Sequence, residues 1–202
     1  MDNLRTQIIH EASLMFQQFG IRSVSIDNIC KTLSISKKTF YVHFGQKDLL
    51  VDAVLDYQEL AIQEKFAKLL KDKNAIESLI IIIKEIRKNV DSEYQSMCFD
   101  LQKYHPKIYQ KHEQRKLESM KIGFEMNLKQ GIDEGFYRKD LDLELTSLFH
   151  SIQLKKSFEI MELSPKKYTK KRLVDFFIDL IVHLIANENG LKYMDENYYK
   201  TE

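Results

Sequence analysis

Apolar residues recur at three- and four-residue spacing along most of this chain, which is the pattern of amphipathic helices. The first such segment covers residues 3–19 and is followed by Gly20, a residue that suits a left-handed helix end. Two shorter segments, residues 26–33 and 37–44, each follow a serine that can accept hydrogen bonds from the first helical turn. The pattern therefore predicts three short helices that share one small core.

Longer helices are predicted for the rest of the chain. One covers residues 46–70, and the next begins at a capping-box-like pair, Asn74 and Glu77, ahead of the apolar run 79–83. The β-branched residues of this run would suit a buried strand, but the cap and the helical context favour a helix. The remaining expected helices are 91–104 with Asp91 as its cap, 106–134, 142–163, and, after a restart at Ser164-Pro165, a last long one through 173–185. The segment after Asn187 is polar with scattered tyrosines, and its pattern leaves open whether it docks or frays.

Composition supports an all-α fold, because only 6 Gly and 2 Pro occur in 202 residues and a β-rich chain needs more turn residues. No apolar run approaches the roughly 18 residues of a membrane span, and no basic-then-apolar leader is present. Cys30 and Cys98 are too few for a disulfide framework. These features predict a cytoplasmic protein without a membrane partner.

A helix-turn-helix is predicted in residues 25–48, where two short capped helices flank a tight turn. The net charge of the chain is only +1, so affinity for DNA must be local. Lys37, Lys38 and Thr39 open the second short helix, from which they can reach base edges in the major groove. Ser25 and Ser36 can cap their helices while exposing backbone N–H groups to a phosphate, and His43 is a plausible phosphate or base neighbour. An ordinary solvated lysine face is the alternative for Lys37 and Lys38 taken alone.

A set of motifs in the first quarter of the chain has a family resemblance. The motifs are Ile8-Ile9-His10-Glu11-Ala12 with Phe16 and Phe19-Gly20, Ser25-Ile26-Asp27-Asn28-Ile29, Ser36-Lys37-Lys38-Thr39-Phe40-Tyr41 with His43-Phe44, and Lys47-Asp48-Leu49-Leu50. Together they resemble a TetR-type bacterial transcriptional regulator. A looser resemblance continues at Tyr104-His105-Pro106 and at the turn 131–136. The chain departs from the family at Lys38, where glycine is frequent, and at Phe40, where a smaller aliphatic residue is frequent.

The resemblance implies an N-terminal helix-turn-helix DNA-binding domain, residues 1–46, joined by a long helix to a helical effector-binding and dimerisation domain, residues 47–202. It implies that Tyr41 and Lys47 contact phosphates of double-stranded DNA. It also implies a homodimer that binds a palindromic operator, and a small-molecule effector whose binding releases the DNA. The expected function is therefore that of a transcriptional regulator, in particular a repressor.

Two sets of apolar residues are candidates for the effector pocket and the dimer interface. The pocket candidates are Phe66, Met97, Phe99, Tyr104, Tyr109, Met120, Phe124 and Phe149. The interface candidates are Phe149, Ile152, Phe158, Phe176, Phe177, Leu180 and Leu184. A structural core would need the same residues, and the second set could pack within one monomer. Methionine and tyrosine among aliphatic residues suit an adaptable, mostly apolar pocket.

Other functional classes find less support. The chain has no nucleophile elbow, glycine-rich phosphate loop or metal-ligand spacing, so neither an enzyme nor a cofactor is expected. His105, His112, His150 and His183 show no recognisable ligand spacing, so no metal site is predicted. The alternative function is a helical protein-interaction module with a vestigial DNA-binding unit. An activator, or a regulator without an effector, is a further possibility.

Overall fold

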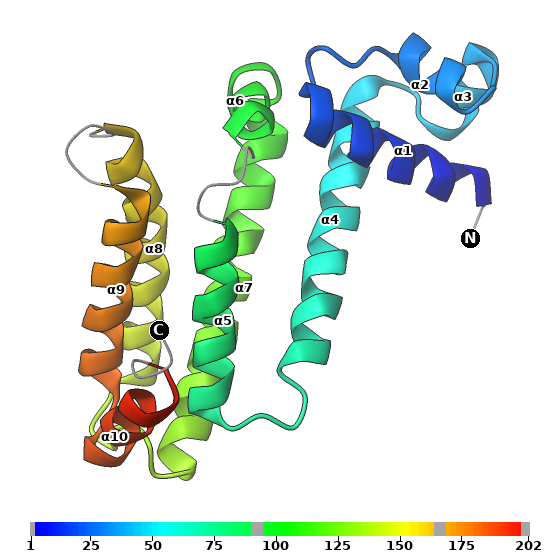
Figure 1. Cartoon of the computed structure of the whole chain (residues 1–202). Coiled ribbons are helices and arrows are strands. Elements are labelled where there is room, and N and C mark those ends of the chain that lie inside the picture. Colours follow the sequence, from blue (N-terminus) through cyan, green and yellow to red (C-terminus); the bar gives the residue numbers. More distant parts are fainter. Residues whose placement is uncertain (1–2, 90–94, 164–168, 199–202) are drawn as a thin grey trace. The chain divides into compact units, whose positions relative to one another are not determined.

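The computed structural model describes residues 3–89, 95–163 and 169–198, apart from the side chains of 89, 95–96, 157–163 and 170 (Figure 1). The helices are α1 Asn3–Phe19, α2 Ile26–Thr32, α3 Lys37–His43, α4 Lys47–Leu69, α5 Ala75–Asn89, α6 Gln95–Tyr104, α7 Pro106–Asp133, α8 Leu143–Leu163, α9 Lys170–Ile185 and α10 Glu188–Asn197. The described chain has no strand, only an isolated β-bridge, so the all-α prediction is confirmed. No described helix has both the length and the apolarity needed to cross a membrane. The predicted Asp91 cap and Ser164-Pro165 restart lie outside the described residues.

The N-terminal helices begin and end where local chemistry predicts. Gly20 follows α1 with a φ of 78°, a conformation that favours glycine. Ser25 caps α2, and its side chain and that of Asn28 form a reciprocal capping box. Ser36 caps α3 by accepting a hydrogen bond from the Thr39 backbone N–H at 3.0 Å. These bonds satisfy donors that the first turn of a helix leaves unpaired, so each boundary follows from a few neighbouring residues.

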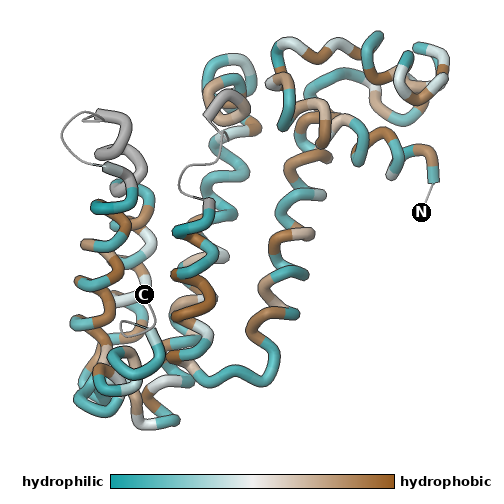
Figure 2. Tube along the Cα trace, in the orientation of Figure 1, coloured by the Kyte–Doolittle hydropathy of each residue, from teal (hydrophilic) through white to brown (hydrophobic). Residues whose placement is uncertain are grey.

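The apolar run at 79–83 lies in α5 and is helical, as predicted. The Asn74 N–H donates to Glu77 Oε2 at 3.1 Å, and the Glu77 N–H donates to Asn74 Oδ1 at 2.8 Å. This capping box starts the helix, and Leu79, Ile80 and Ile83 are buried on it. Figure 2 shows how hydrophobic positions recur between hydrophilic ones along the helices.

The described chain divides into two compact units. Unit 1 comprises Met1–Ala67 and Glu93–Gln114, and unit 2 comprises Lys68–Ser92 and Arg115–Glu202. These units differ from the predicted division at residue 46, because unit 1 also takes in most of α4, α6 and the start of α7. The physical reason is apolar packing: Leu50 and Val54 of α4 and Met97 and Leu101 of α6 are buried in the same core as α1–α3. As a functional division, the boundary at residue 46 stays a prediction.

Unit 2 has its own core, which encloses a buried hydrogen-bonded tyrosine. The Tyr137 hydroxyl donates to Asn127 Oδ1 at 3.0 Å and lies 3.3 Å from the Ala75 carbonyl oxygen. The Asn127 amide donates to the same carbonyl at 2.8 Å. Burial raises the pKa of Tyr137 well above its ordinary value, so the phenol stays neutral. The network ties the start of α5 to α7 and to the turn that follows α7.

The polar C-terminal segment docks as helix α10. Asn187 caps this helix by accepting from the Gly190 N–H at 3.1 Å, and its amide donates to the carbonyls of Gly135 and Tyr137. Met194 and Tyr198 are buried in the core of unit 2. The docking is decided by tertiary contacts, which explains why the local pattern left it open.

Candidate functional sites

Helix α3 has one buried face and one exposed face. Phe40 and Phe44 are buried in the core of unit 1. Lys38 lies on the opposite face, and Lys37 and Tyr41 are also exposed at the surface. Tyr41 is 49% exposed and packs edge-on against Phe40, with ring centroids 5.6 Å apart. The turn between α2 and α3 therefore presents two cations and a phenol on one short, capped helix.

The two adjacent lysines have different surroundings. The Lys37 ammonium lies 2.8 Å from Asp27 Oδ1, and this ion pair raises the pKa of Lys37. Lys38 is exposed and has no hydrogen bond or ion pair with any described residue. Because its ammonium is not neutralised locally, Lys38 is the more available cation on α3.

The hydroxyl groups of the predicted site are largely engaged within the protein. Ser36 Oγ accepts from the Thr39 N–H and lies 2.8 Å from Thr39 Oγ1. Ser25 Oγ accepts from the Asn28 N–H at 3.1 Å and also contacts the Asn28 side chain. Thr39 and His43 are half-buried. The serines therefore hold the helix N-termini in shape.

Lys47 is used within unit 1. Its ammonium donates to the carbonyls of Ile21 and Val24, both at 2.6 Å, and lies 5.9 Å from the centre of the Phe16 ring. Burial lowers the pKa of Lys47. These bonds fix the connection between α1 and α2, and they leave one of the three N–H donors of the ammonium for another partner.

One residue of the exposed face was missed from the sequence. Val42 is 76% exposed on α3, next to Tyr41. Positions 38, 41 and 42 share a helix face opposite Phe40 and Phe44, so helical spacing alone could have identified it. An exposed methyl-bearing side chain beside cations is the type of group that packs on a thymine methyl.

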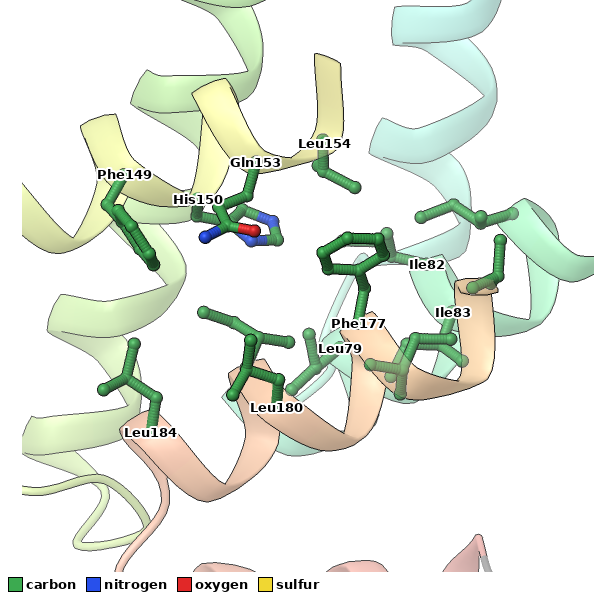
Figure 3. A pocket seen from close by; sticks show the side chains of 14 residues that line it. Leu79, Ile82, Ile83, Phe149, His150, Gln153, Leu154, Phe177, Leu180 and Leu184 are labelled. Carbon is green, nitrogen blue, oxygen red and sulfur yellow. The ribbon is translucent and has the colours of Figure 1, made fainter. Parts of the chain in front are cut away.

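Unit 2 contains an apolar cavity of about 70 Å³ between α5, α8 and α9 (Figure 3). Twelve of its fourteen lining residues are aliphatic or phenylalanine, and the other two are His150 and Gln153 of α8. The imidazole of His150 packs against the ring of Phe124, with centroids 4.0 Å apart. Burial lowers the pKa of His150 to about 4, so the ring is neutral at pH 7.

Most residues predicted for a pocket lie elsewhere. Phe149 lines this cavity, and Phe124 packs against the lining residue His150. The others do not line it: Phe66, Met97, Phe99, Tyr104 and Tyr109 belong to unit 1, and Met120 is on α7 in unit 2. Met97 is buried in the core of unit 1, and Phe99 is 57% exposed. Periodicity identified these residues as apolar but could not say which core each one joins.

The residues predicted for a dimer interface are also divided. Phe177, Leu180 and Leu184 line the cavity. Ile152 and Phe176 are 49% and 59% exposed, and Phe158 lies outside the described side chains. Further exposed apolar residues accompany them on α8, namely Leu145, Leu148 and Phe149. Helices α8 and α9 pack together, and both carry apolar side chains that one chain leaves uncovered.

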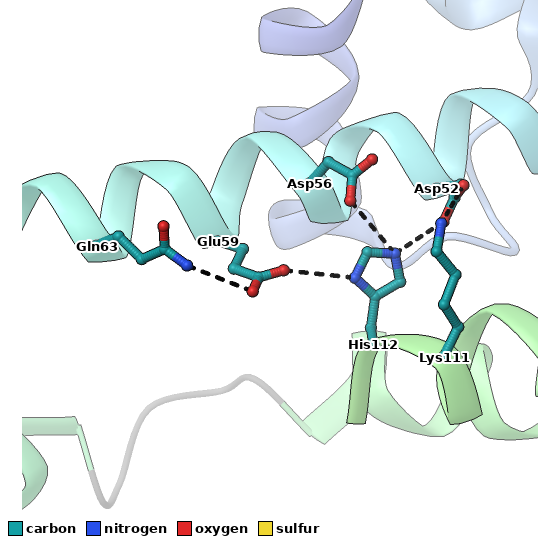
Figure 4. Close-up of polar contacts among 6 residues, drawn as sticks. All are labelled: Asp52, Asp56, Glu59, Gln63, Lys111 and His112. Atoms are coloured by element: carbon teal, nitrogen blue, oxygen red, sulfur yellow. Dashed lines mark hydrogen bonds and ion pairs between the residues drawn. The ribbon is translucent and has the colours of Figure 1, made fainter. Parts of the chain in front are cut away.

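A polar cluster joins α4 to α7 within unit 1 (Figure 4). His112 Nε2 and the Lys111 ammonium each lie 2.8 Å from Asp52. Burial alone would raise the pKa of Asp52, but the hydrogen bonds from Lys111 and His112 hold it below its ordinary value. Asp52, Asp56 and His112 are close enough to hold a metal ion, a grouping invisible in the sequence because His112 is 60 residues from Asp52. The Lys111 ammonium already compensates part of this negative charge.

These features define a class: an all-helical protein with an N-terminal helix-turn-helix unit and a second helical unit that contains an apolar cavity. A sequence model described as "Bacterial regulatory proteins, tetR family" matches residues 8–54, which span the end of α1 to the start of α4. The N-terminal part of the chain is thus similar to this family, in agreement with the resemblance of its N-terminal motifs.

Individual proteins are similar to this chain in part of its sequence or in its fold. The HTH-type transcriptional regulator UidR of Escherichia coli strain K12 is 39% identical over 70 residues, which are 31% of this chain and 36% of UidR. The match thus spans about a third of the relative's length. A TetR-family regulator from Cytophaga hutchinsonii has the same fold, with a TM-score of 0.71 at 18% identity over 93% of this chain and 96% of its own. A regulator from Saccharomonospora viridis in complex with choline has a TM-score of 0.65 at 22% identity, over 93% and 100%.

Proposed function

We propose that this protein is a DNA-binding transcriptional regulator of the cytoplasm, a repressor that binds a palindromic operator as a homodimer. A small, mostly apolar molecule releases it from the DNA. The observation that carries the proposal is helix α3, whose exposed face bears Lys38, Tyr41 and Val42 above the buried Phe40 and Phe44. A short capped helix with cations, a phenol and a methyl group on its outer face suits the major groove. The relatives and the fold are those of transcriptional regulators, which are not enzymes.

Phosphate contacts would position the helix, and base contacts would specify the site. In the proposed complex, Tyr41 and the remaining N–H donor of Lys47 contact phosphates. Lys38 and Val42 face base edges. Ser25 and Ser36 cap α2 and α3 so that the N-termini of these helices face the DNA phosphates. Lys37 adds a cation, but its ion pair with Asp27 must first break.

Dimerisation is supported by the uncovered apolar side chains of α8 and α9. Exposed apolar patches on a soluble protein mark interaction surfaces. A two-fold pairing through these helices would give an isologous interface. It would also place two copies of α3 about 34–36 Å apart, in successive major grooves, which is why the proposed operator is palindromic.

In this proposal, the effector releases the DNA by shifting the equilibrium between two conformational states of the dimer. One state of the dimer holds both α3 helices at groove spacing, and the other does not. A molecule that prefers the second state weakens DNA binding by its differential affinity, typically about 1–3 kcal/mol. Helix α4 begins directly after α3, and α7 contributes residues to both units, so these two helices are the proposed route of coupling.

The test is capture of genomic DNA fragments by the purified protein at near-physiological salt. The expected result is enrichment of a short palindrome that a Lys38→Ala, Tyr41→Ala variant does not enrich. A Lys71→Ala variant, altered at an exposed lysine that belongs to unit 2, should enrich the same palindrome. Uniform or absent enrichment by a folded wild-type protein would contradict the proposal and favour the protein-interaction module.

A further inference from the structure

The polar part of the cavity in unit 2 consists of the His150 imidazole and the Gln153 amide of α8. His150 has its ring contact with Phe124, but no hydrogen bond or ion pair joins it to any described residue. It lines the cavity together with Gln153, and the close-up view labels both side chains at the α8 wall (Figure 3). The His150 ring is half-buried, so its two nitrogens remain open to a hydrogen bond from outside the protein. A molecule bound in the cavity could supply such a partner.

The cavity lining limits the charge of that molecule. None of the described residues that line it is an acid, a lysine or an arginine, and the His150 ring is neutral at pH 7. A cation or an anion would therefore lose its hydration without gaining an opposite charge, which is strongly unfavourable. A quaternary ammonium such as the choline bound by the Saccharomonospora viridis relative would find no carboxylate here.

The neutral imidazole determines which polar group of the occupant can form a hydrogen bond with it. One ring nitrogen carries a proton and donates, while the other has a lone pair and accepts. A hydroxyl group can use either nitrogen, and a carbonyl oxygen can accept from the protonated one. Apart from His150 and Gln153, the twelve lining residues offer only apolar surface to the rest of the occupant.

We infer that this cavity takes a neutral, mainly apolar molecule whose single hydroxyl or carbonyl oxygen forms a hydrogen bond with His150. The inference rests on the proposed function, because it names the chemical class of the effector. The apolar side chains of a second copy are not the occupant, since they would leave the imidazole without a partner. The volume of about 70 Å³ is roughly half that of a cavity of roughly 150 Å³ that admits benzene. The occupant therefore displaces the half-exposed Phe149 or extends past it.

The experiment compares four probes of similar size by NMR-detected titration of the whole protein at pH 7, without DNA. The probes are p-cresol, which is neutral with a hydroxyl, toluene, which lacks one, benzylamine, which is a cation, and benzoate, which is an anion. The variants are His150→Phe, which keeps a ring against Phe124 but removes both nitrogens, and His183→Phe, the same change at an exposed histidine of α9. His150→Leu serves as the second variant, and thermal unfolding checks the fold of each.

The expected result is that the wild-type protein and His183→Phe bind p-cresol and toluene but neither charged probe. In His150→Phe, the ratio of p-cresol to toluene affinity falls about tenfold or more, because the hydroxyl is buried without a partner. An unchanged ratio in His150→Phe and His150→Leu overturns the inference. So does binding of a charged probe as tight as that of p-cresol, or no binding of any probe. Since DNA is absent, failure of the operator experiment would leave this result standing, and the two failures are distinguishable.

Discussion

Lys37 and Lys38 are neighbours on α3, yet their ammonium groups have different surroundings. Lys37 is paired with Asp27 at 2.8 Å, although both side chains are more than half exposed. Lys38 has no partner in the described chain. An exposed ion pair contributes little to stability, but it does reduce the charge that Lys37 offers to a phosphate or base.

We predict that Lys38→Ala weakens DNA binding more than Lys37→Ala does. If Lys38 contacts a base, the variant should lose about 1–3 kcal/mol of binding free energy at the preferred sequence. If Lys38 contacts a phosphate, binding should weaken for all sequences, and the dependence of log affinity on log salt concentration should be less steep by about 1. Titrations of captured operator DNA at several salt concentrations measure both quantities. Asp27→Asn, which releases Lys37, should strengthen binding. Equal losses at the two lysines would contradict the assignment.

His150 makes the stability of unit 2 depend on pH. Its folded-state pKa, about 4, lies below the ordinary value, 6.5, so the unfolded chain takes up the proton first as the pH falls. The free energy of unfolding should therefore decrease between pH 6.5 and pH 4, by at most about 3 kcal/mol from this group. Urea unfolding of the wild-type protein and of His150→Phe across this range tests the prediction. As the pH falls, the wild-type protein should lose stability relative to His150→Phe. A difference in the free energy of unfolding that stays constant with pH would contradict the prediction.

At the scale of elements, α7 contains two glycines that differ in the space around them. Helix propensity favours their replacement by alanine, but packing allows it at only one of them. A Cβ atom at Gly131 would lie 2.1 Å from the Tyr137 ring, whereas one at Gly123 would have no neighbour within 4 Å. Helix propensity favours alanine over glycine by about 1 kcal/mol at both sites. The Tyr137 ring cannot move away easily, because its hydroxyl is held by Asn127 and the Ala75 carbonyl.

We predict that Gly123→Ala stabilises the protein by up to about 1 kcal/mol. Gly131→Ala should destabilise it by more than 1 kcal/mol, because the overpacked ring must move. Chemical unfolding of the two variants gives the comparison, with each serving as the control for the other. Stabilisation by Gly131→Ala would show that the Tyr137 network can shift without loss.

At the scale of the whole molecule, the two units fold around separate cores, and each contains one of the proposed sites. Helix α3 belongs to unit 1, and the cavity belongs to unit 2. The exposed apolar residues of α8 and α9 also belong to unit 2, so both the proposed effector site and the proposed dimer interface lie in this unit.

We predict that Ile152→Glu with Phe176→Glu converts the proposed dimer to a monomer, because burying two carboxylates in an apolar interface is strongly unfavourable. Sedimentation velocity should show the halved mass, and DNA titrations should show the loss of operator affinity. Ile122→Glu, a change at an equally exposed apolar residue of α7, is the control and should stay dimeric. A dimeric double variant would place the interface elsewhere.

The sequence by itself determined most of the helices and several of their ends. Ser25, Ser36 and the pair Asn74–Glu77 act through hydrogen bonds that reach only a few residues, and Gly20 acts through its own φ. The motifs of residues 8–50 likewise identified the helix-turn-helix, because its caps, turn and buried aromatics are consecutive in the chain.

Only the tertiary structure decided which distant residues meet. Lys47 contacts the Ile21 carbonyl, His112 meets Asp52, and α10 docks on unit 2 through packing that no local pattern encodes. The same packing places the half-buried His150 in the wall of an apolar cavity. Side-chain partners across helices depend on how whole apolar faces fit together, and that fit is a property of the assembled core.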